Sequence, residues 1–152
     1  MSANDDGKPA GELQTTALEA LLGFQLRRAQ LKLFQHFAAA MAELALSPGQ
    51  AGVLILIENN PGISQAALAR ALEIERATLG ETIAGLQQRD WLERRRSAND
   101  ARSLALYLSV NGHRRMKKVH LTIRQHEREI SRGLTAQEGR ELHRLIRKFN
   151  SA

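Results

Sequence analysis

The segment of residues 63–109 constrains the fold more than any other part of the sequence. Two helix-forming stretches, at about 65–72 and 76–89, are separated by a short turn. Two strand-forming stretches follow, and alternate residues of the range 104–108 are leucine. Because side chains alternate between the two faces of a strand, these leucines can share one buried face. The segment is therefore predicted to fold as a helix pair followed by a β-hairpin.

The predicted hairpin is rich in arginine, which has no role in an apolar face. Arg94, Arg95 and Arg96 lie on its first strand, and Arg102 lies near its tip. Successive residues of a strand point in opposite directions, so one strand arginine is expected to form a surface salt bridge or to cover apolar surface. A helix pair followed by a basic hairpin is the arrangement of a winged helix-turn-helix. There, one helix can enter the major groove of DNA while the hairpin reaches the flanking backbone or minor groove.

Composition agrees with a DNA-binding role. The chain of 152 residues carries a formal net charge of +6, which favours a polyanionic partner such as double-stranded DNA. A hydrophobic content of 43% predicts a globular chain, and the lack of cysteine excludes disulfides and thiol chemistry. The polar N-terminus has no signal-peptide core and no apolar run is long enough to span a membrane. A cytoplasmic protein without a membrane partner is therefore expected.

The sequence contains no pattern that predicts catalysis. A glycine-rich phosphate loop, a nucleophile elbow and paired carboxylates are all absent, so neither an enzyme nor a bound cofactor is expected. The five histidines raise the question of a metal site. A zinc site needs four donors, however, and the histidines have neither cysteine partners nor an obvious local cluster. Solvated or interface histidines are favoured, and no metal is expected.

Helices are predicted on both sides of the central segment. Residues 1–12 are expected to form a disordered tail. Residues 13–46 and 110–150 are expected to form a helical dimerisation region around a DNA-binding region at 47–109. The first long helix is apolar on more than one side, which favours a second subunit as packing partner. The predicted fold class is mainly α with a small β-hairpin, a winged helix-turn-helix plus a helical dimerisation layer.

Hydroxyl side chains mark where these helices should begin. An N-cap hydroxyl accepts a hydrogen bond from an otherwise unpaired amide of the first helical turn. Three pairs have the spacing of a capping box, namely Thr16 with Glu19, Ser47 with Gln50, and Thr135 with Glu138. Ser64 and Ser109 are predicted as single N-caps.

Five short motifs carry a family resemblance. They are Leu46-Ser47-Pro48-Gly49-Gln50, Ser64-Gln65-Ala66-Ala67-Leu68-Ala69, Glu75-Arg76-Ala77-Thr78-Leu79, Asp100-Ala101-Arg102, and Leu106-Tyr107-Leu108-Ser109 with Gly112. Their order and spacing resemble the multiple antibiotic resistance regulator (MarR) family from about Thr16 to Asn150. The resemblance implies a homodimeric transcription factor, usually a repressor released by a small molecule, with helices from both termini at the dimer interface.

The sequence departs from the family pattern at a few positions. Ala101 stands where the family often has a basic residue after the wing aspartate, and Gly80 and Gly85 lie inside the predicted second helix. Each internal glycine weakens a helix by roughly 1 kcal/mol relative to alanine, so either close packing or a shortened helix is expected there. The lack of cysteine argues against the peroxide-sensing branch of the family.

Candidate DNA contacts come from three places. Arg76 can bind guanine through its paired acceptors, and Thr78 can touch a thymine methyl group or a phosphate, although capping and solvation would also explain them. The start of the first helix suits phosphate binding, although an N-cap role alone accounts for Ser64. At the hairpin tip, Asp100 can hold the guanidinium of Arg102 for entry into a narrow minor groove. The DNA-binding set is Ser64, Gln65, Arg76, Ala77, Thr78, Arg94, Arg96, Asp100 and Arg102.

A candidate effector site is predicted around the first long helix. Arg27 and Arg28 lie on an otherwise apolar stretch and can bind a carboxylate or phosphate, although a solvated helix edge is the simpler interpretation. The segment Leu22–Ala29 most resembles MarR-like members that control degradation of aromatic acids, which implies an aromatic acid or its coenzyme A thioester. The aromatic side chains also suit core or dimer packing. The ligand-binding set is Arg27, Arg28, Phe34, Phe37, His36 and His120.

Three hypotheses remain open from the sequence. The first is a homodimeric repressor that binds a pseudo-palindromic operator and responds to a small anionic or aromatic effector. The second is an architectural DNA-binding protein without an effector, and the third is a winged helix for protein interaction whose charge is incidental. Operator selectivity over random DNA separates the first two hypotheses. Failure to bind any duplex at low salt would favour the third.

Overall fold

The computed structural model of the chain describes residues 15–96 and 104–151. The chain divides into two compact units, residues 1–34 and 35–152. The expected tail at residues 1–12 lies outside the described residues and stays a prediction. Within the described part of the chain, no helix is both long and apolar enough to cross a membrane.

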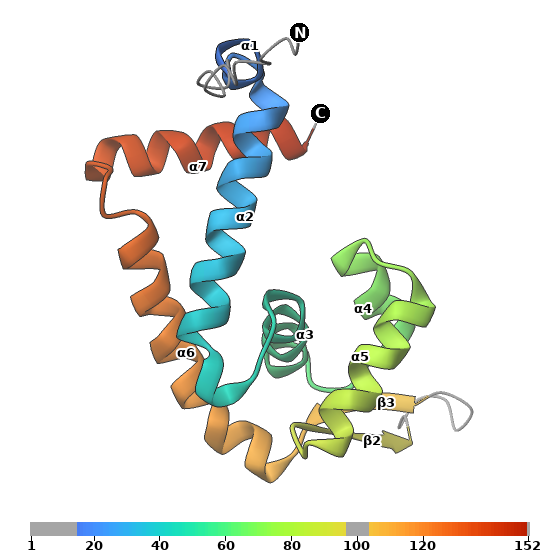
Figure 1. The fold of residues 1–152 in the computed structure, drawn as a ribbon. Coiled ribbons are helices and arrows are strands. Elements are labelled where there is room, and N and C mark those ends of the chain that lie inside the picture. Colours follow the sequence, from blue (N-terminus) through green and yellow to red (C-terminus); the bar gives the residue numbers. More distant parts are fainter. Residues whose placement is uncertain (1–14, 97–103, 152) are drawn as a thin grey trace, which may run out of the picture. The chain divides into compact units, whose positions relative to one another are not determined.

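The first unit contains a short helix, α1 (Thr16–Glu19), and the beginning of a longer one (Figure 1). The sequence predicted one continuous helix capped by Thr16, but the N-cap is Thr15, whose hydroxyl donates to the Glu19 carboxylate at 3.0 Å. The side-chain amide of Gln25 donates to the Glu19 carbonyl at 2.6 Å. This bond satisfies the acceptor that a continuous helix would pair with its own backbone, so the break costs little.

The remaining elements are the rest of the long helix α2, two further helices, the helix-turn-helix, the strands and two C-terminal helices (Figure 1). In chain order they are α2 (Leu22–Ala40), η1 (Ala42–Leu44), α3 (Pro48–Asn59), β1 (Ile63–Ser64), α4 (Gln65–Leu72), α5 (Arg76–Gln88), β2 (Leu92–Arg96), β3 (Leu104–Leu108), α6 (Val110–Ile130) and α7 (Ala136–Asn150). The predicted helix pair at 65–72 and 76–89 is therefore confirmed to within one residue.

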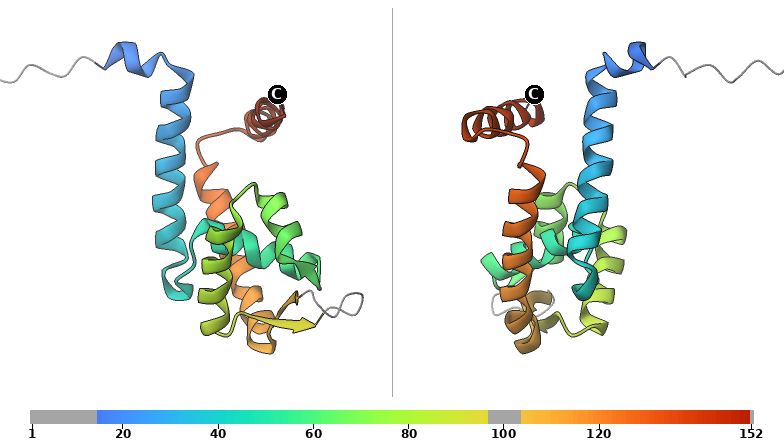
Figure 2. Two further views of the ribbon diagram at one scale, coloured as in Figure 1. Left: turned by 90° about the vertical axis from the view of Figure 1, so that its right-hand side faces the viewer. Right: turned by 60° about the vertical axis from the view of Figure 1, so that its left-hand side comes forward.

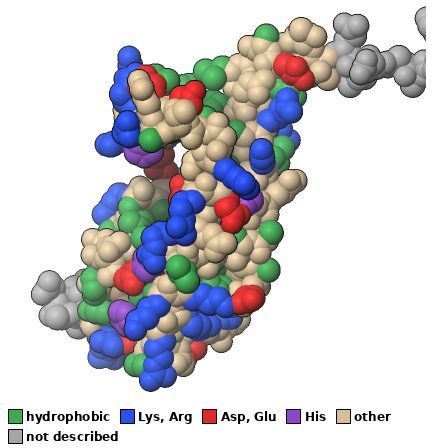
Figure 3. Space-filling view, turned by 90° about the vertical axis from the view of Figure 1, so that its left-hand side faces the viewer, with side chains coloured by type: hydrophobic (Ala, Val, Ile, Leu, Met, Phe, Trp, Pro, Cys, Tyr) green, Lys and Arg blue, Asp and Glu red, His purple; other side chains and the backbone are tan. Residues whose placement is uncertain are grey.

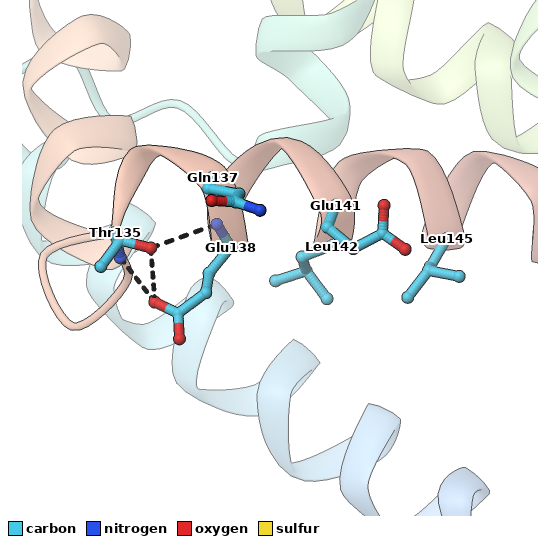
Figure 4. Close-up of a pocket in the computed structure, with 6 residues that line it drawn as sticks. All are labelled: Thr135, Gln137, Glu138, Glu141, Leu142 and Leu145. Atoms are coloured by element: carbon cyan, nitrogen blue, oxygen red, sulfur yellow. Dashed lines mark hydrogen bonds between the residues drawn. The ribbon is translucent and has the colours of Figure 1, made fainter.

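The predicted N-caps of the second unit are confirmed. Ser64 accepts from the Ala67 amide at 3.2 Å and Ser109 from the Gly112 amide at 2.9 Å. Both predicted capping boxes of this unit form. In the one that opens α7, the Glu138 amide donates to the Thr135 hydroxyl at 3.3 Å while the Thr135 amide donates to the Glu138 carboxylate at 2.7 Å (Figure 4). The box at the start of α3 has the same two bonds.

The strands form a three-stranded antiparallel sheet in the order β1-β3-β2. The hairpin pairs Leu92 with Leu108 and Arg96 with Leu104, and Ile63 of β1 pairs with Leu106. The short extended link expected at Ile63 is thus the third strand of the sheet. It holds the start of α4 against the hairpin, because α4 begins where β1 ends.

The core lies between α3, α4, α5, the sheet and the N-terminal half of α6. It is formed mainly by aliphatic side chains that are at most 1% exposed. They are Met41, Val53, Leu54, Ile57, Leu68, Leu79, Ile83, Leu86, Leu106, Met116 and Val119, together with the single tryptophan, Trp91. The leucine alternation predicted for 104–108 buries Leu106 and Leu108, while Leu104 is half exposed.

One glycine fixes how closely α6 approaches the hairpin. A Cβ atom at Gly112 would lie 2.0 Å from the backbone oxygen of Trp91, far inside any normal contact. The same oxygen accepts a hydrogen bond from the Ser109 amide at 3.1 Å. Glycine is required here because only a residue without a side chain lets the first turn of α6 pack on the chain that enters β2.

Candidate nucleic-acid interface

The two helices of the helix-turn-helix are joined by a tight turn. Glu73 ends α4 in the left-handed region, with φ of 54°, and Glu75 is the N-cap of α5. The side-chain amide of Gln65 donates to the Arg76 carbonyl at 3.3 Å. This bond places the candidate contacts at the starts of α4 and α5 next to one another, and both views of Figure 2 show the two helices side by side.

The helix α5 is buried on one side and open on the other. Leu79, Ile83 and Leu86 are fully buried, as the sequence predicted, whereas all three residues of the range 76–78 are exposed. The helix continues unbroken through both internal glycines, so the shortened helix considered from the sequence does not form. Residues 76–78 thus offer a polar surface with one cation, Arg76, and one hydroxyl, Thr78.

The strand arginines divide between two roles. In the hairpin register Arg94 and Arg96 share one face, and Arg95 lies on the other. Arg95 donates to the Glu93 carboxylate through Nε at 2.7 Å, and its guanidinium carbon lies 4.7 Å from the centre of the Tyr107 ring. The prediction that one of the three serves a surface salt bridge or covers apolar surface is therefore confirmed, and the residue is Arg95.

Arg94 and Arg96 are both exposed on the hairpin face that Arg95 does not share. The other two hairpin candidates, Asp100 and Arg102, lie outside the described residues. Their proposed contact with a minor groove therefore stays a prediction. The described candidates supply exposed cations from two elements of one unit, α5 and β2.

A cluster of hydrogen bonds at the C-terminal end of α5 was not predicted from the sequence. The Arg89 guanidinium donates to the carbonyls of Leu44 and Ala45, at 2.5 and 2.9 Å. Arg115 of α6 donates through Nη2 to the carbonyls of Arg89 and Asp90, at 2.7 Å each. These four bonds tie the end of α5 to α6 and to the chain that follows η1. No local pattern predicts them, because the partners are between 25 and 45 residues apart.

Asp90 provides the turn that makes this cluster possible. Its φ is 53°, in the left-handed region, where aspartate is one of the few non-glycine residues commonly found. Its carbonyl also accepts from the Ser109 hydroxyl at 2.8 Å. The Arg115 guanidinium carbon lies 3.9 Å from the centre of the Trp91 ring, which adds a cation–π contact. The end of α5, the start of the hairpin and α6 therefore meet at one joint, formed around Asp90, Trp91 and Arg115.

The candidate effector residues of the first unit lie on the exposed surface of α2. Arg28 lies 3.7 Å from the Glu19 carboxylate, and its guanidinium carbon lies 5.9 Å from the centre of the Phe24 ring. Arg27 is exposed, and Phe34 is 51% exposed. Arg28 is thus partly engaged within its own unit, while Arg27 forms no salt bridge or side-chain hydrogen bond with another described residue.

The candidate effector residues of the second unit do not form one group. Phe37 is buried in the core, as expected for the packing interpretation. Nε2 of His120 lies 2.6 Å from a Glu58 carboxylate oxygen, so this histidine faces α3. His36 contacts His126 and Glu129 instead, both on α6. The structure therefore pairs each candidate histidine with a different carboxylate.

A second basic surface follows α6. Figure 3 shows Lys and Arg side chains gathered over the N-terminal half of this helix, on the side of the molecule turned away from α4 and α5. The exposed cations of the helix are Arg114, Lys117, Lys118, Arg124 and Arg128. Helical periodicity places most of them opposite the buried stripe of α6. This surface therefore faces away from α5.

The fold and the exposed basic helix and strand define a winged helix-turn-helix DNA-binding protein. Residues 46–103 match the sequence model of the MarR family. A relative from Thauera aromatica, a "Putative transcriptional regulatory protein for hcr operon", is 30% identical over 148 residues, which cover 94% of this chain and 89% of that protein. The chain belongs to the MarR family, whose members are transcriptional regulators and not enzymes.

Solved structures agree with this assignment. The transcriptional repressor CouR, bound to a 23-mer DNA duplex, is 31% identical, with a TM-score of 0.87 over 91% of this chain and 99% of that one. The PcaV regulator from Streptomyces coelicolor, in complex with its natural ligand, is 24% identical, with a TM-score of 0.81 over 100% and 99% of the two chains. At that identity PcaV supports the fold alone. The fold class predicted from the sequence is confirmed.

Proposed function

We propose that the chain is a homodimeric repressor that binds a near-palindromic operator and is released by a small aromatic acid or its coenzyme A thioester. The DNA-binding part rests on one observation, the exposed polar surface at residues 76–78 on a helix whose opposite side is fully buried. The DNA-bound structure of the similar repressor CouR supports this part. A regulator of this kind acts where the chromosome lies, so a cytoplasmic location is proposed with it.

Each candidate contact receives a role in this proposal. The residues of α5 at 76–78 read base edges or bind phosphate in the major groove. Ser64 and Gln65, at the start of α4, offer amides to a phosphate. Arg94 and Arg96 neutralise backbone charge beside the hairpin, while Asp100 and Arg102 form the proposed minor-groove contact. Arg95 is left out because Glu93 and Tyr107 already engage it.

The dimer is proposed to form through residues 13–46 and 110–150. The helix α7 contains no buried residue, and Leu142, Leu145 and Phe149 are between 47% and 60% exposed. Leu142 and Leu145 point to the same side of α7 in Figure 4. An amphipathic helix whose apolar face is not covered by any of the described residues is stabilised when a second copy buries that face.

The effector is proposed to bind through its acidic group to Arg27 or Arg28, with Phe34 as an apolar wall. The support is the exposed Arg27 and the half-exposed Phe34 on the same helix, α2, together with the sequence similarity to the hcr operon regulator. Arg27→Ala and Arg28→Ala should each keep DNA binding and weaken release by the effector. Full release in both variants would refute the anion-binding role.

The direct test of the proposed function is to sequence genomic DNA fragments that the purified chain selects. The proposal predicts a near-palindrome whose half-sites lie about 10 base pairs apart, or a multiple of that, because a two-fold dimer presents two recognition helices to one face of DNA. Genes beside the selected fragments supply effector candidates for release assays. Binding without any sequence enrichment would instead support the architectural hypothesis.

A further inference from the structure

Two histidines join the C-terminal end of α2 to α6 through their ring nitrogens. Nδ1 of His36 lies 2.7 Å from Nδ1 of His126. The His126 ring is 5% exposed and packs edge-on against Phe37, with ring centres 5.3 Å apart. Nε2 of His36 lies 3.0 Å from Oε2 of Glu129, which also accepts a hydrogen bond from Gln125 through its other oxygen. Glu129, His36 and His126 thus form a hydrogen-bonded chain from solvent to the edge of the core.

These three groups do not converge on a common point. One ring of His36 uses its two nitrogens for two different partners, which lie on opposite sides of that ring. A metal ion needs its donors to surround it, and no group of three or more potential ligands does so among the described residues. The arrangement is a linear chain of hydrogen bonds, which can bind and share protons.

The hydrogen bonds of the histidine pair limit how many protons its two rings can carry. An ionised Glu129 only accepts, so Nε2 of His36 donates to it. When His36 is neutral, its Nδ1 accepts from the Nδ1–H of His126. When His36 is protonated, its Nδ1–H donates to a bare Nδ1 of His126. Either way the contact tolerates at most one proton beyond two neutral rings, because a second would place two N–H groups head to head.

We propose that His36 and His126 form an acid-sensitive latch, which holds the C-terminal end of α2 against α6 until the pair takes up its second extra proton. Opening the latch releases residues 35–40 from α6 and exposes the edge of the core at Phe37. This latch does not depend on the proposed effector or on its binding site.

The surrounding charges set the range in which the latch opens. Burial, followed by the charge of His36, lowers the pKa of His126, while Glu127 and Glu129 on the same helix oppose that shift. Hydrogen bonds from Gln125 and His36 hold the pKa of Glu129 below its ordinary value, so Glu129 remains an acceptor in mild acid. A histidine whose pKa is depressed by folding stabilises the protein above its unfolded pKa of about 6.5, and this stabilisation is lost as the pH falls below that value.

A second histidine of α6 contacts a carboxylate on α3. Nε2 of His120 lies 2.6 Å from a Glu58 carboxylate oxygen of α3. This contact does not involve His36 or His126, so the latch can open without breaking it.

The test is the pH dependence of urea unfolding of the full chain, in the wild type and in His126→Asn. Asparagine can donate or accept a hydrogen bond near the position of Nδ1 but takes up no proton. Between pH 8 and 5 the wild type should lose stability with a slope that corresponds to about one more proton bound on unfolding than in His126→Asn. The control is His113→Asn, an exposed position on the same helix, which should keep the wild-type slope. Equal slopes for the wild type and His126→Asn would overturn the proposal.

Nitrogen-15 spectra of the histidine rings give a second readout, which can be recorded on the wild-type chain. At pH 7.5 exactly one of the two Nδ1 atoms should carry the shared proton, and amide signals of residues 35–40 should shift as both rings become charged. His36→Asn should remove that acid-induced shift. Two rings that become fully protonated while those amides stay unchanged would also overturn the proposal.

Discussion

The close approach of Gly112 to the backbone of Trp91 predicts a large effect for the small substitution Gly112→Ala. The added methyl carbon would lie 2.0 Å from the Trp91 carbonyl oxygen and 2.9 Å from its carbonyl carbon. Both atoms belong to the backbone, which cannot rotate away as a flexible side chain can. Restoring an acceptable contact requires α6 to retreat from β2 by about 1 Å or more.

Moving α6 away from β2 would strain several hydrogen bonds at once. The Ser109 amide bonds to the Trp91 carbonyl, the Ser109 hydroxyl bonds to the Asp90 carbonyl, and Arg115 reaches the carbonyls of Arg89 and Asp90. Overpacking alone costs about 1–3 kcal/mol, and each weakened bond adds about 0.5–1.5 kcal/mol. We expect Gly112→Ala to lose about 3–5 kcal/mol of unfolding free energy, a large part of the roughly 5–15 kcal/mol typical of a domain.

Urea unfolding at one fixed protein concentration measures this loss. Gly85→Ala is the matched control, because a Cβ atom there meets nothing within 4 Å and lies inside α5. That variant should keep its stability or gain up to about 1 kcal/mol from better helix propensity. If Gly112→Ala loses less than about 1 kcal/mol, the joint between α6 and the hairpin is looser than these contacts require, and the reasoning is wrong.

Two further predictions concern DNA and assembly. Arg94→Ala should weaken binding to the selected DNA and lower the salt dependence of the binding constant by about one unit of slope. Arg95→Ala should leave that slope unchanged, because Arg95 is paired with Glu93. Loss of this exposed pair should change stability only slightly. Equal slopes for the two variants would contradict the division of roles on β2. Phe149→Asp should convert the dimer to a monomer in light scattering, because it places a charge in the proposed apolar interface of α7. A dimer of undiminished stability would exclude α7 from that interface.

Local chemistry explains why much of the fold could be predicted from the sequence. The caps at Ser47, Ser64 and Thr135 each depend on the residue three positions further on, and the buried side of α5 follows from helical spacing. The one cap predicted at the wrong residue, Thr16, has a second threonine directly before it, and sequence spacing could not separate the two.

Contacts between distant residues could not be predicted in the same way. His36 and His126 are 90 residues apart, and nothing in either neighbourhood indicates the other. The bonds of Arg115 end on backbone carbonyls, which every residue possesses, so no side-chain pattern could identify their acceptors. The sequence predicted that one of the three strand arginines would form a salt bridge or cover apolar surface. It could not identify Arg95 as that residue, because its role depends on Tyr107 across the hairpin.

Trp91, the one tryptophan of the chain, gives the molecule an optical reporter of its own. Its indole ring is fully buried where α5 ends and β2 begins, and the positive charge of Arg115 lies over the ring. Indole emission changes in wavelength and intensity when a nearby charge moves or water enters. A ligand or a duplex that turns α5 relative to α6 would therefore change the fluorescence of the unlabelled protein, and one that leaves this joint intact would not.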